Sequence, residues 1–183
     1  MNKLGIIDRK KTAFILVDVQ EKFMPVINNI DKVIANSNIL IKSAEILQIP
    51  LIATEQYPKG LGKTVDAINL PEKKAPIEKV CFSCFDSEEF SRKVKELKIE
   101  SIVLFGIEAH VCILQTSLAA LKNNLDVYVV SDAVSSRTPE NKAIAIDRMH
   151  QSGVFIVSTE MLLFQLLKKA GTEEFRQISK LIK

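Results

Sequence analysis

The stretch TAFILVDV, from Thr12 to Val19, decides the fold. It is apolar at nearly every position, which is typical of a central parallel strand that is buried on both faces. The stretches PLIAT (Pro50 to Thr54), SIVLF (Ser101 to Phe105) and DVYVV (Asp126 to Val130) have the same character. The sequence therefore predicts a sheet built mainly from parallel strands.

Helical patterns separate these apolar runs. Asp31 to Gln48 carries apolar residues at helical spacing, so we expect an amphipathic helix there. Asp86 followed by Glu89 resembles a capping box that opens a helix ending at Leu97. Thr138 before Pro139 fits an N-cap with proline at the first helical position. The other predicted elements are strands at Ile77 to Val80 and Val154 to Val157, and helices after Gly106, after Ser158 through Leu167, and over Thr172 to Ile182.

The alternation of strands and helices predicts an α/β protein with three α/β/α layers around a parallel, Rossmann-like, six-stranded sheet. We interpret Glu55 to Pro76, which contains three prolines and two glycines, as a long surface loop. No linker or internal repeat divides the 183 residues, so residues 1–183 are predicted to form a single domain. In such folds the ligand crevice lies beyond the carboxyl ends of the strands.

Composition excludes several classes of partner. The net charge of +3 comes from 25 basic and 22 acidic residues, too mild and scattered to indicate nucleic-acid binding. No apolar run reaches the roughly 18 residues of a membrane span. Met1 to Lys11 has no apolar segment typical of a signal peptide, and Cys81, Cys84 and Cys112 are an odd number of cysteines. We therefore expect free thiols in a reducing, cytoplasmic setting.

Three residues lie at or just past the ends of predicted strands and are candidates for chemistry. Asp18 lies in an apolar strand, where a buried carboxylate needs a partner, although it could instead cap a loop. Lys79 ends the short third strand, where an isolated lysine is usually solvated. Cys112 falls in the first turn of the helix after SIVLF, although free cysteines are usually small buried hydrophobes.

Together the three residues indicate an activated nucleophile. A helix N-terminus and a nearby ammonium both favour thiolate, so the pKa of Cys112 is expected to be lowered. Asp18 could accept the thiol proton, and Lys79 could hold the carboxylate and stabilise the thiolate. We therefore expect Asp18, Lys79 and Cys112 to meet in one crevice.

Longer motifs around these residues resemble a known family. VDVQ (Val17 to Gln20) with Phe23, EKVCFSCF (Glu78 to Phe85) and GIEAHVC (Gly106 to Cys112) are similar to the three signature segments of isochorismatase-like hydrolases. The resemblance covers roughly Lys11 to Leu167 and is greatest to the small isochorismatase domain-containing branch. It implies the isochorismatase-like hydrolase fold, with Cys112 as nucleophile, Asp18 as general base and later acid, and Lys79 as electrostatic partner.

The resemblance also implies the surroundings of the nucleophile. It implies a cis peptide bond at Ile107–Glu108, which aims the backbone N–H groups of Glu108 and Cys112 into an oxyanion hole. Gln20 and Phe23 are implied to line the substrate pocket, with His110 near its rim. Family members usually form dimers or larger rings, so a homo-oligomer is expected.

The implied reaction is hydrolysis of an amide-type C–N bond in a small molecule through a thioester. Related nicotinamidases bind a metal through an Asp and two His, but this chain has only His110 and His150, and its Glu55 to Lys74 stretch has none. We therefore expect no metal and no other cofactor. Cys81-x-x-Cys84 is interpreted as a packing pair beside Lys79. Two alternatives remain: a non-catalytic interaction protein on the same fold, or vinyl-ether hydrolysis of an isochorismate-type acid.

Overall fold

Six parallel strands form one sheet in the computed structural model, which describes residues 4–71 and 75–183. The strand order is β3-β2-β1-β4-β5-β6, and every neighbouring pair is parallel. The strands are β1 (Thr12–Val17), β2 (Leu51–Gln56), β3 (Ile77–Lys79), β4 (Ser101–Ile107), β5 (Asp126–Ser135) and β6 (Phe155–Val157). The predicted parallel, six-stranded sheet is confirmed.

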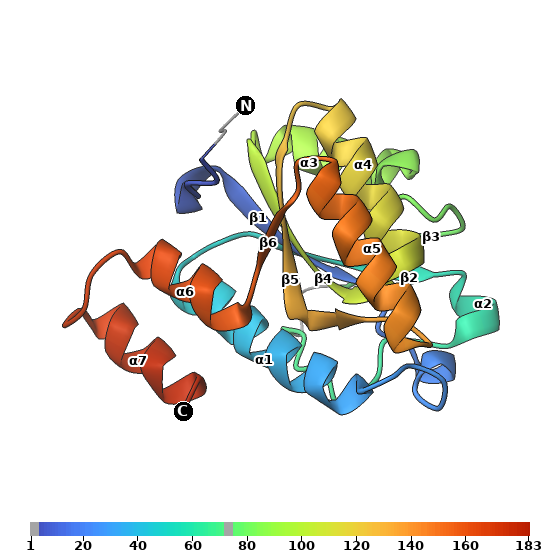
Figure 1. The fold of residues 1–183 in the computed structure, drawn as a ribbon, viewed down its shortest axis with the longest axis horizontal. Coiled ribbons are helices and arrows are strands. Elements are labelled where there is room, and N and C mark those ends of the chain that lie inside the picture. The colour runs from blue at the N-terminus through green and yellow to red at the C-terminus, as the bar shows by residue number, and fades with distance from the viewer. Residues whose placement is uncertain (1–3, 72–74) are drawn as a thin grey trace.

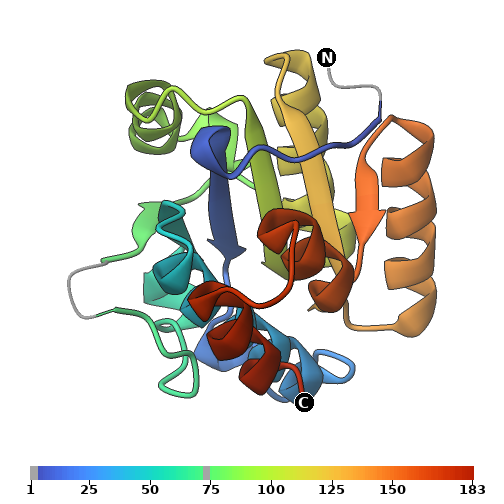
Figure 2. The ribbon, with the colours of Figure 1, turned by 90° about the vertical axis from the view of Figure 1, so that its left-hand side faces the viewer.

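Helices cover both faces of the sheet, which confirms the predicted three layers (Figure 1). One face carries α1 (Ile30–Ile46), α6 (Thr159–Leu167) and α7 (Glu173–Leu181), and the other carries α3 (Glu88–Glu96), α4 (Leu114–Lys122) and α5 (Pro139–Gln151). Helix α7 packs against α1 and α6 (Figure 2). Short elements are α2 (Pro58–Leu61), the 3-10 turns η1 (Arg9–Lys11), η2 (Glu21–Phe23) and η3 (Cys84–Asp86), and the π-helical turn η4 (Ala109–Ile113).

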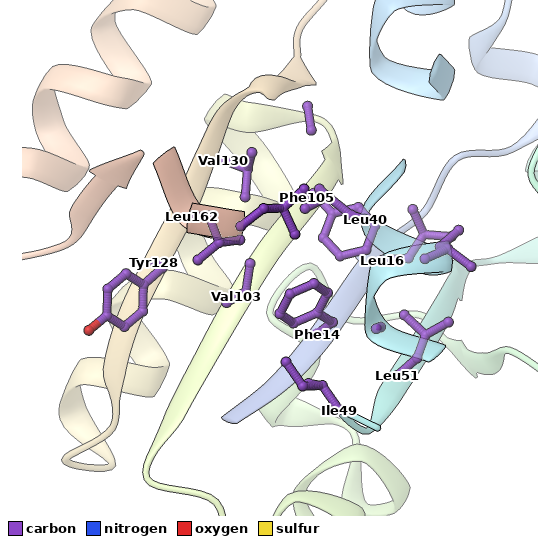
Figure 3. Close-up of a cluster of buried hydrophobic side chains, with 14 of the residues drawn as sticks. Phe14, Leu16, Leu40, Ile49, Leu51, Val103, Phe105, Tyr128, Val130 and Leu162 are labelled. Carbon is purple, nitrogen blue, oxygen red and sulfur yellow. The ribbon is translucent and has the colours of Figure 1, made fainter. Parts of the chain in front are cut away.

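Strand β1 is apolar from Ala13 to Val17 because these residues contribute to two separate cores. Phe14 and Leu16 point to the face covered by α1 and α6, where they gather with Leu40 and Phe105 (Figure 3). Ala13, Ile15 and Val17 point to the opposite face and join the core beneath α3, α4 and α5. The alternation of side chains along a strand thus divides one apolar run between both layers of helices.

The stretch Glu55 to Pro76 is not a loop throughout, so that prediction is wrong in part. Strand β2 continues through Gln56, and α2 follows directly. Residues 72–74 of this stretch lie outside the described part of the chain. The strand is extended because Glu55 and Gln56 pair in register with Glu78 and Lys79 of β3, a tertiary contact that local composition does not reveal.

Helix caps agree with the sequence at two positions and differ at one. Thr138 caps α5 by accepting a hydrogen bond from Asn141 N, and Ser158 caps α6 in the same way from Met161 N. Helix α3 is capped by Ser87, whose side chain accepts from Phe90 N, so the predicted capping box at Asp86 is wrong. Asp86 belongs instead to the preceding 3-10 turn η3.

The chain turns to opposite sides of the sheet after β1 and after β4, which lie side by side at its centre. Such a switch point opens a crevice at the carboxyl ends of the two strands. Gly106 lets the strands approach closely there: it has φ +113°, and a Cβ atom on it would lie 2.2 Å from the Val17 carbonyl oxygen. The functional candidates lie around this crevice.

Candidate active site

Asp18 follows directly on β1 and turns its side chain into the crevice. Its backbone has φ +55°, so the strand ends at Val17, and the side chain is fully buried. Thr54 donates its hydroxyl to Asp18 Oδ1 at 2.7 Å, and Lys79 Nζ donates to Oδ2 at 2.7 Å. Each carboxylate oxygen therefore has a partner, as a buried charge requires.

Lys79 lies at the end of β3, where strand register pairs it with Gln56 of β2. Its ammonium contacts Asp18 Oδ2 at 2.7 Å and Gln56 Oε1 at 2.8 Å, and the side chain has no exposed surface. Burial by itself lowers the pKa of Lys79, but the charge of Asp18, with the two nearby thiols, raises that pKa above its ordinary value. The ammonium is therefore retained in the closed interior of the site.

Cys112 brings the sulfur to the same place from the turn that follows β4. It lies in η4 and is 5% exposed, and its Sγ is 3.8 Å from Lys79 Nζ. The ammonium therefore contacts both the carboxylate of Asp18 and the sulfur of Cys112. The structure brings together three side chains from three separate segments of the chain.

The pKa of Cys112 is raised, so the expectation of a lowered value is wrong. Burial is the largest cause, the charge of Asp18 adds to it, and Lys79 opposes it only in part. Helix α4 begins at Leu114, so the sulfur lies in the π-helical turn before the first regular turn of that helix. The resting group is a neutral thiol with a carboxylate beside it to accept its proton.

A cavity of about 250 Å³ opens beside the sulfur. Most of its walls are apolar or aromatic, and its lining residues are Phe23, Gln56, Tyr57, Leu61, Phe82, Glu108, Val111 and Cys112. Phe23 thus lies where the resemblance places a pocket residue. Its size suits a small molecule or one end of a larger one.

Gln20 and His110 lie near this cavity but are not among its lining residues. The Gln20 amide accepts from Gln56 N at 2.7 Å and donates to the carbonyls of Gln56, at 3.0 Å, and Gly62, at 2.7 Å. His110 Nδ1 pairs with Ser136 Oγ at 3.0 Å. Gln20 therefore fixes the backbone that carries Gln56 and Tyr57, and direct substrate contact by Gln20 or His110 stays a prediction.

Two residues that complete the charged cluster were not found from the sequence. Thr54 donates a hydrogen bond to the Asp18 carboxylate, and Gln56 accepts one from the Lys79 ammonium. Gln56 also donates Nε2 to the Val80 carbonyl at 2.8 Å, which ties β2 to the residue after Lys79. The only available signal was their place at the carboxyl end of the second strand, next to Asp18 and Lys79.

Other expectations about the site concern its backbone and its thiols. The peptide bond Ile107–Glu108 is cis, which confirms what the resemblance implies. The oxyanion hole at Glu108 and Cys112 stays a prediction.

Cys84 is fully buried, its N–H donates to Thr116 Oγ1 at 3.0 Å, and burial with the charge of Asp18 raises its pKa to about 12. Cys84 is thus a buried thiol whose pKa is raised, and its packing role stays a prediction.

Among residues 4–71 and 75–183, no group of three or more His, Cys, Asp or Glu side chains is arranged to hold a metal ion. Within the same ranges, no helix combines the length and apolar character needed to cross a bilayer.

Solved structures show where this fold occurs. A MAR1 ribonuclease from Caenorhabditis elegans superposes with a TM-score of 0.91 and 38% identity, over 97% of this chain and 92% of that one. YcaC from Escherichia coli, described as an octameric hydrolase of unknown specificity, superposes with a TM-score of 0.89 at 23% identity, over 97% and 90%. At that identity the second similarity shows the fold alone.

Sequence comparisons agree with the geometry. Residues 12–161 match the model of the isochorismatase domain. The secreted isochorismatase effector Isc1 of Phytophthora sojae is 40% identical, over 99% of this chain and 89% of its own. Isochorismatase domain-containing protein 2A of Mus musculus is 38% identical, over 98% and 86%. This chain therefore belongs to the isochorismatase family.

Proposed function

We propose that this protein is a cysteine hydrolase that cleaves an amide-type C–N bond of a small molecule through a thioester at Cys112. One observation carries the proposal: a single buried ammonium, Lys79 Nζ, lies 2.7 Å from the Asp18 carboxylate and 3.8 Å from the Cys112 sulfur, beside a cavity of about 250 Å³. Nucleophile, proton acceptor and orienting charge are thus within reach of one bound substrate.

The raised pKa of Cys112 determines how the first step proceeds. Because the thiol is neutral at rest, its proton passes to Asp18 while Sγ attacks the carbonyl carbon. Lys79 stays charged and stabilises the sulfur anion as it forms. Asp18 then gives the proton to the departing nitrogen, so the C–N bond breaks and a thioester remains on Cys112.

The second half-reaction releases the acid and restores the thiol. A water molecule attacks the thioester carbon, and Asp18 accepts a proton from that water. The C–S bond breaks, and the proton on Asp18 returns to the Cys112 sulfur. The reaction consumes one amide and one water and yields one carboxylic acid and one amine or ammonia. The backbone N–H groups of Glu108 and Cys112 are proposed to hold the oxyanion in both steps.

The test is a panel of small amides assayed for released amine, with acid-quenched samples examined by intact-protein mass spectrometry. Wild type should release amine and show an acyl adduct on Cys112. Cys112→Ser should do neither, while Cys81→Ser, which removes another free thiol near Lys79, should behave as wild type. Turnover without any dependence on Cys112 would refute the thioester pathway, and vinyl-ether hydrolysis that survives Cys112→Ala would favour the isochorismate-type alternative.

RNA cleavage is a second candidate function, because the C. elegans relative of known structure is described as a ribonuclease at 38% identity over nearly the whole chain. Against it, the cavity beside Cys112 has an acidic lining residue, Glu108, and no basic one among the described residues. Polynucleotides bind through basic surfaces. Incubation of a labelled RNA with wild type and with Cys112→Ser decides the question: cleavage that is equal in both variants would place any nuclease site elsewhere.

The homo-oligomeric state and the small-molecule partner belong to the same proposal. The YcaC fold neighbour is an octamer, and light scattering on this protein would give its own mass in solution. A monomer would remove that part of the proposal and leave the chemistry of Cys112 untouched.

The cytoplasmic location stays a prediction, since one relative is named as secreted. A single domain over residues 1–183 is likewise proposed.

A further inference from the structure

Glu108 has a side chain that the proposed chemistry does not use. Only its backbone N–H has a role in the mechanism, yet the residue lines the cavity next to Cys112. It is the only acidic or basic residue among the described residues that line this cavity. The side chain is 8% exposed, so its charge is held in a largely desolvated position, where charges act strongly on a bound molecule.

The pairing of Glu108 leaves one of its two oxygens available. Oε2 accepts from Arg137 N at 3.2 Å and from Arg137 Nε at 3.1 Å, and His110 Nδ1 lies 4.0 Å from it. Oε1 accepts no hydrogen bond from any described residue. Arg137 is 58% exposed and does not line the cavity, so water screens its charge more than that of Glu108.

The other charges of the site do not cancel this carboxylate. Asp18 and Lys79 form a buried pair whose net charge is zero. Gln56 and Tyr57, the remaining polar lining residues except Cys112, contribute an amide and a phenol and no second carboxylate or ammonium. A molecule bound against the Cys112 sulfur therefore meets the Glu108 carboxylate as a lining group, while the cation paired with it, Arg137, lies outside the cavity lining.

We propose that Glu108 selects substrates that carry a protonated amine or another strong N–H donor close to the scissile carbonyl, and that it rejects substrates carrying a carboxylate there. The proposal rests on Cys112 being the reacting group of the proposed function and adds the substrate class to it. Specificity of this kind comes from attraction to the right group together with repulsion of the wrong one.

The test uses reagents that react with Cys112 whether or not the protein hydrolyses amides. Three methanethiosulfonates of similar size carry an aminoethyl (cationic), a sulfonatoethyl (anionic) or a propyl (neutral) group. In each case Sγ attacks the sulfenyl sulfur, a protein disulfide forms, methanesulfinate leaves, and the thiol proton is released. Rates at Cys112 are measured by peptide mass spectrometry and divided by the rates with free cysteine.

In wild type the corrected rate with the cationic reagent should exceed that with the anionic one by about tenfold, as expected for one unit charge in a partly desolvated site. Glu108→Gln should bring the ratio close to one. Arg137→Gln, which removes the counter-charge, should raise the ratio above that of wild type. Glu78→Gln removes an exposed acidic group from β3 outside the cavity and should leave the ratio unchanged.

The outcomes separate this inference from the proposed function. A wild-type ratio near one, or a ratio that Glu108→Gln and Arg137→Gln both leave unchanged, would show that Glu108 only anchors Arg137. If Glu108→Gln does not fold, the wild-type ratio and its change in Arg137→Gln still decide. A strong preference for the cationic reagent without any amide turnover would support charge selection by Glu108 and contradict the proposed amide hydrolysis. Amide turnover without a preference between the reagents would support the hydrolysis and contradict the charge selection.

Discussion

Replacing Lys79 with methionine removes the one cation among the described residues that contacts the buried carboxylate of Asp18. The two side chains are 0% and 1% exposed, and their contact distance is 2.7 Å. Methionine is similar in length and fills the space of the lysine stem, so the substitution deletes charge and not volume. Asp18 then keeps only the Thr54 hydroxyl as a described side-chain partner.

The expected cost follows from the burial of the pair. Removing one partner of a buried ion pair leaves an uncompensated charge, which costs about 3–5 kcal/mol of folding free energy. For a chain of this size, each kcal/mol lowers the melting temperature by roughly 2–4 °C. We therefore expect Lys79→Met to melt about 6–20 °C below wild type. The second substitution Asp18→Asn, made in the same chain, should recover much of the loss because it removes the orphaned charge.

The chain contains a matched control in Lys11. Its ammonium contacts Glu100 at 2.6 Å, but the two side chains are 51% and 67% exposed. Exposed pairs contribute little, so Lys11→Met should melt close to wild type. The measurement is thermal and urea unfolding followed by circular dichroism for all four proteins. If Lys79→Met and Lys11→Met lose the same stability, or if Asp18→Asn recovers nothing, then a desolvated charge pair does not hold the site together.

Three further predictions follow from the backbone, the proton acceptor and a helix cap. Gly106→Ala should destabilise the protein more than Gly153→Ala. Both glycines have positive φ (+113° and +94°), but only at Gly106 would an added Cβ atom collide with the backbone of another strand. Equal melting temperatures for the two variants would contradict this. Asp18→Asn should abolish amide hydrolysis yet speed iodoacetamide labelling of Cys112 at pH 7.5, because the charge of Asp18 raises the pKa of that thiol. Slower labelling in a folded variant would show that Asp18 does not raise the pKa of Cys112. Ser87→Ala should lower the free energy of unfolding in urea by about 1 kcal/mol, because it removes the side chain that caps α3. An unchanged free energy of unfolding would show that Ser87 does not stabilise the start of this helix.

The sequence was sufficient for the fold and for the three central residues of the candidate site. The apolar run of β1 predicts a strand buried on both faces, and each residue from Ala13 to Val17 does lie in one of two cores. Asp18, Lys79 and Cys112 could be placed because the carboxyl ends of parallel strands meet at one edge of a sheet, and the motifs around them resemble one family.

What could not be predicted depends on contacts between segments far apart in the chain. Gln56 reaches Lys79 only because β2 and β3 pair in a particular register, and the composition of that stretch suggests a loop. The direction of the Cys112 pKa shift depends on how deeply the sulfur is buried, which no local pattern states. The contact of Glu108 with Arg137 joins the ends of two neighbouring strands, although the two residues are 29 positions apart along the chain.

The cavity beside Cys112 and its reacting groups come from two kinds of segment. The reacting groups lie at or just after the carboxyl ends of β1, β3 and β4, whereas Phe23, Tyr57 and Phe82 are contributed by short connecting segments outside the sheet. Exchange of those connecting segments can therefore alter which molecules fit without displacing the sulfur, carboxylate or ammonium. A single scaffold of this kind can diversify into many enzymes, and engineering of new substrate ranges should begin at these three aromatic side chains.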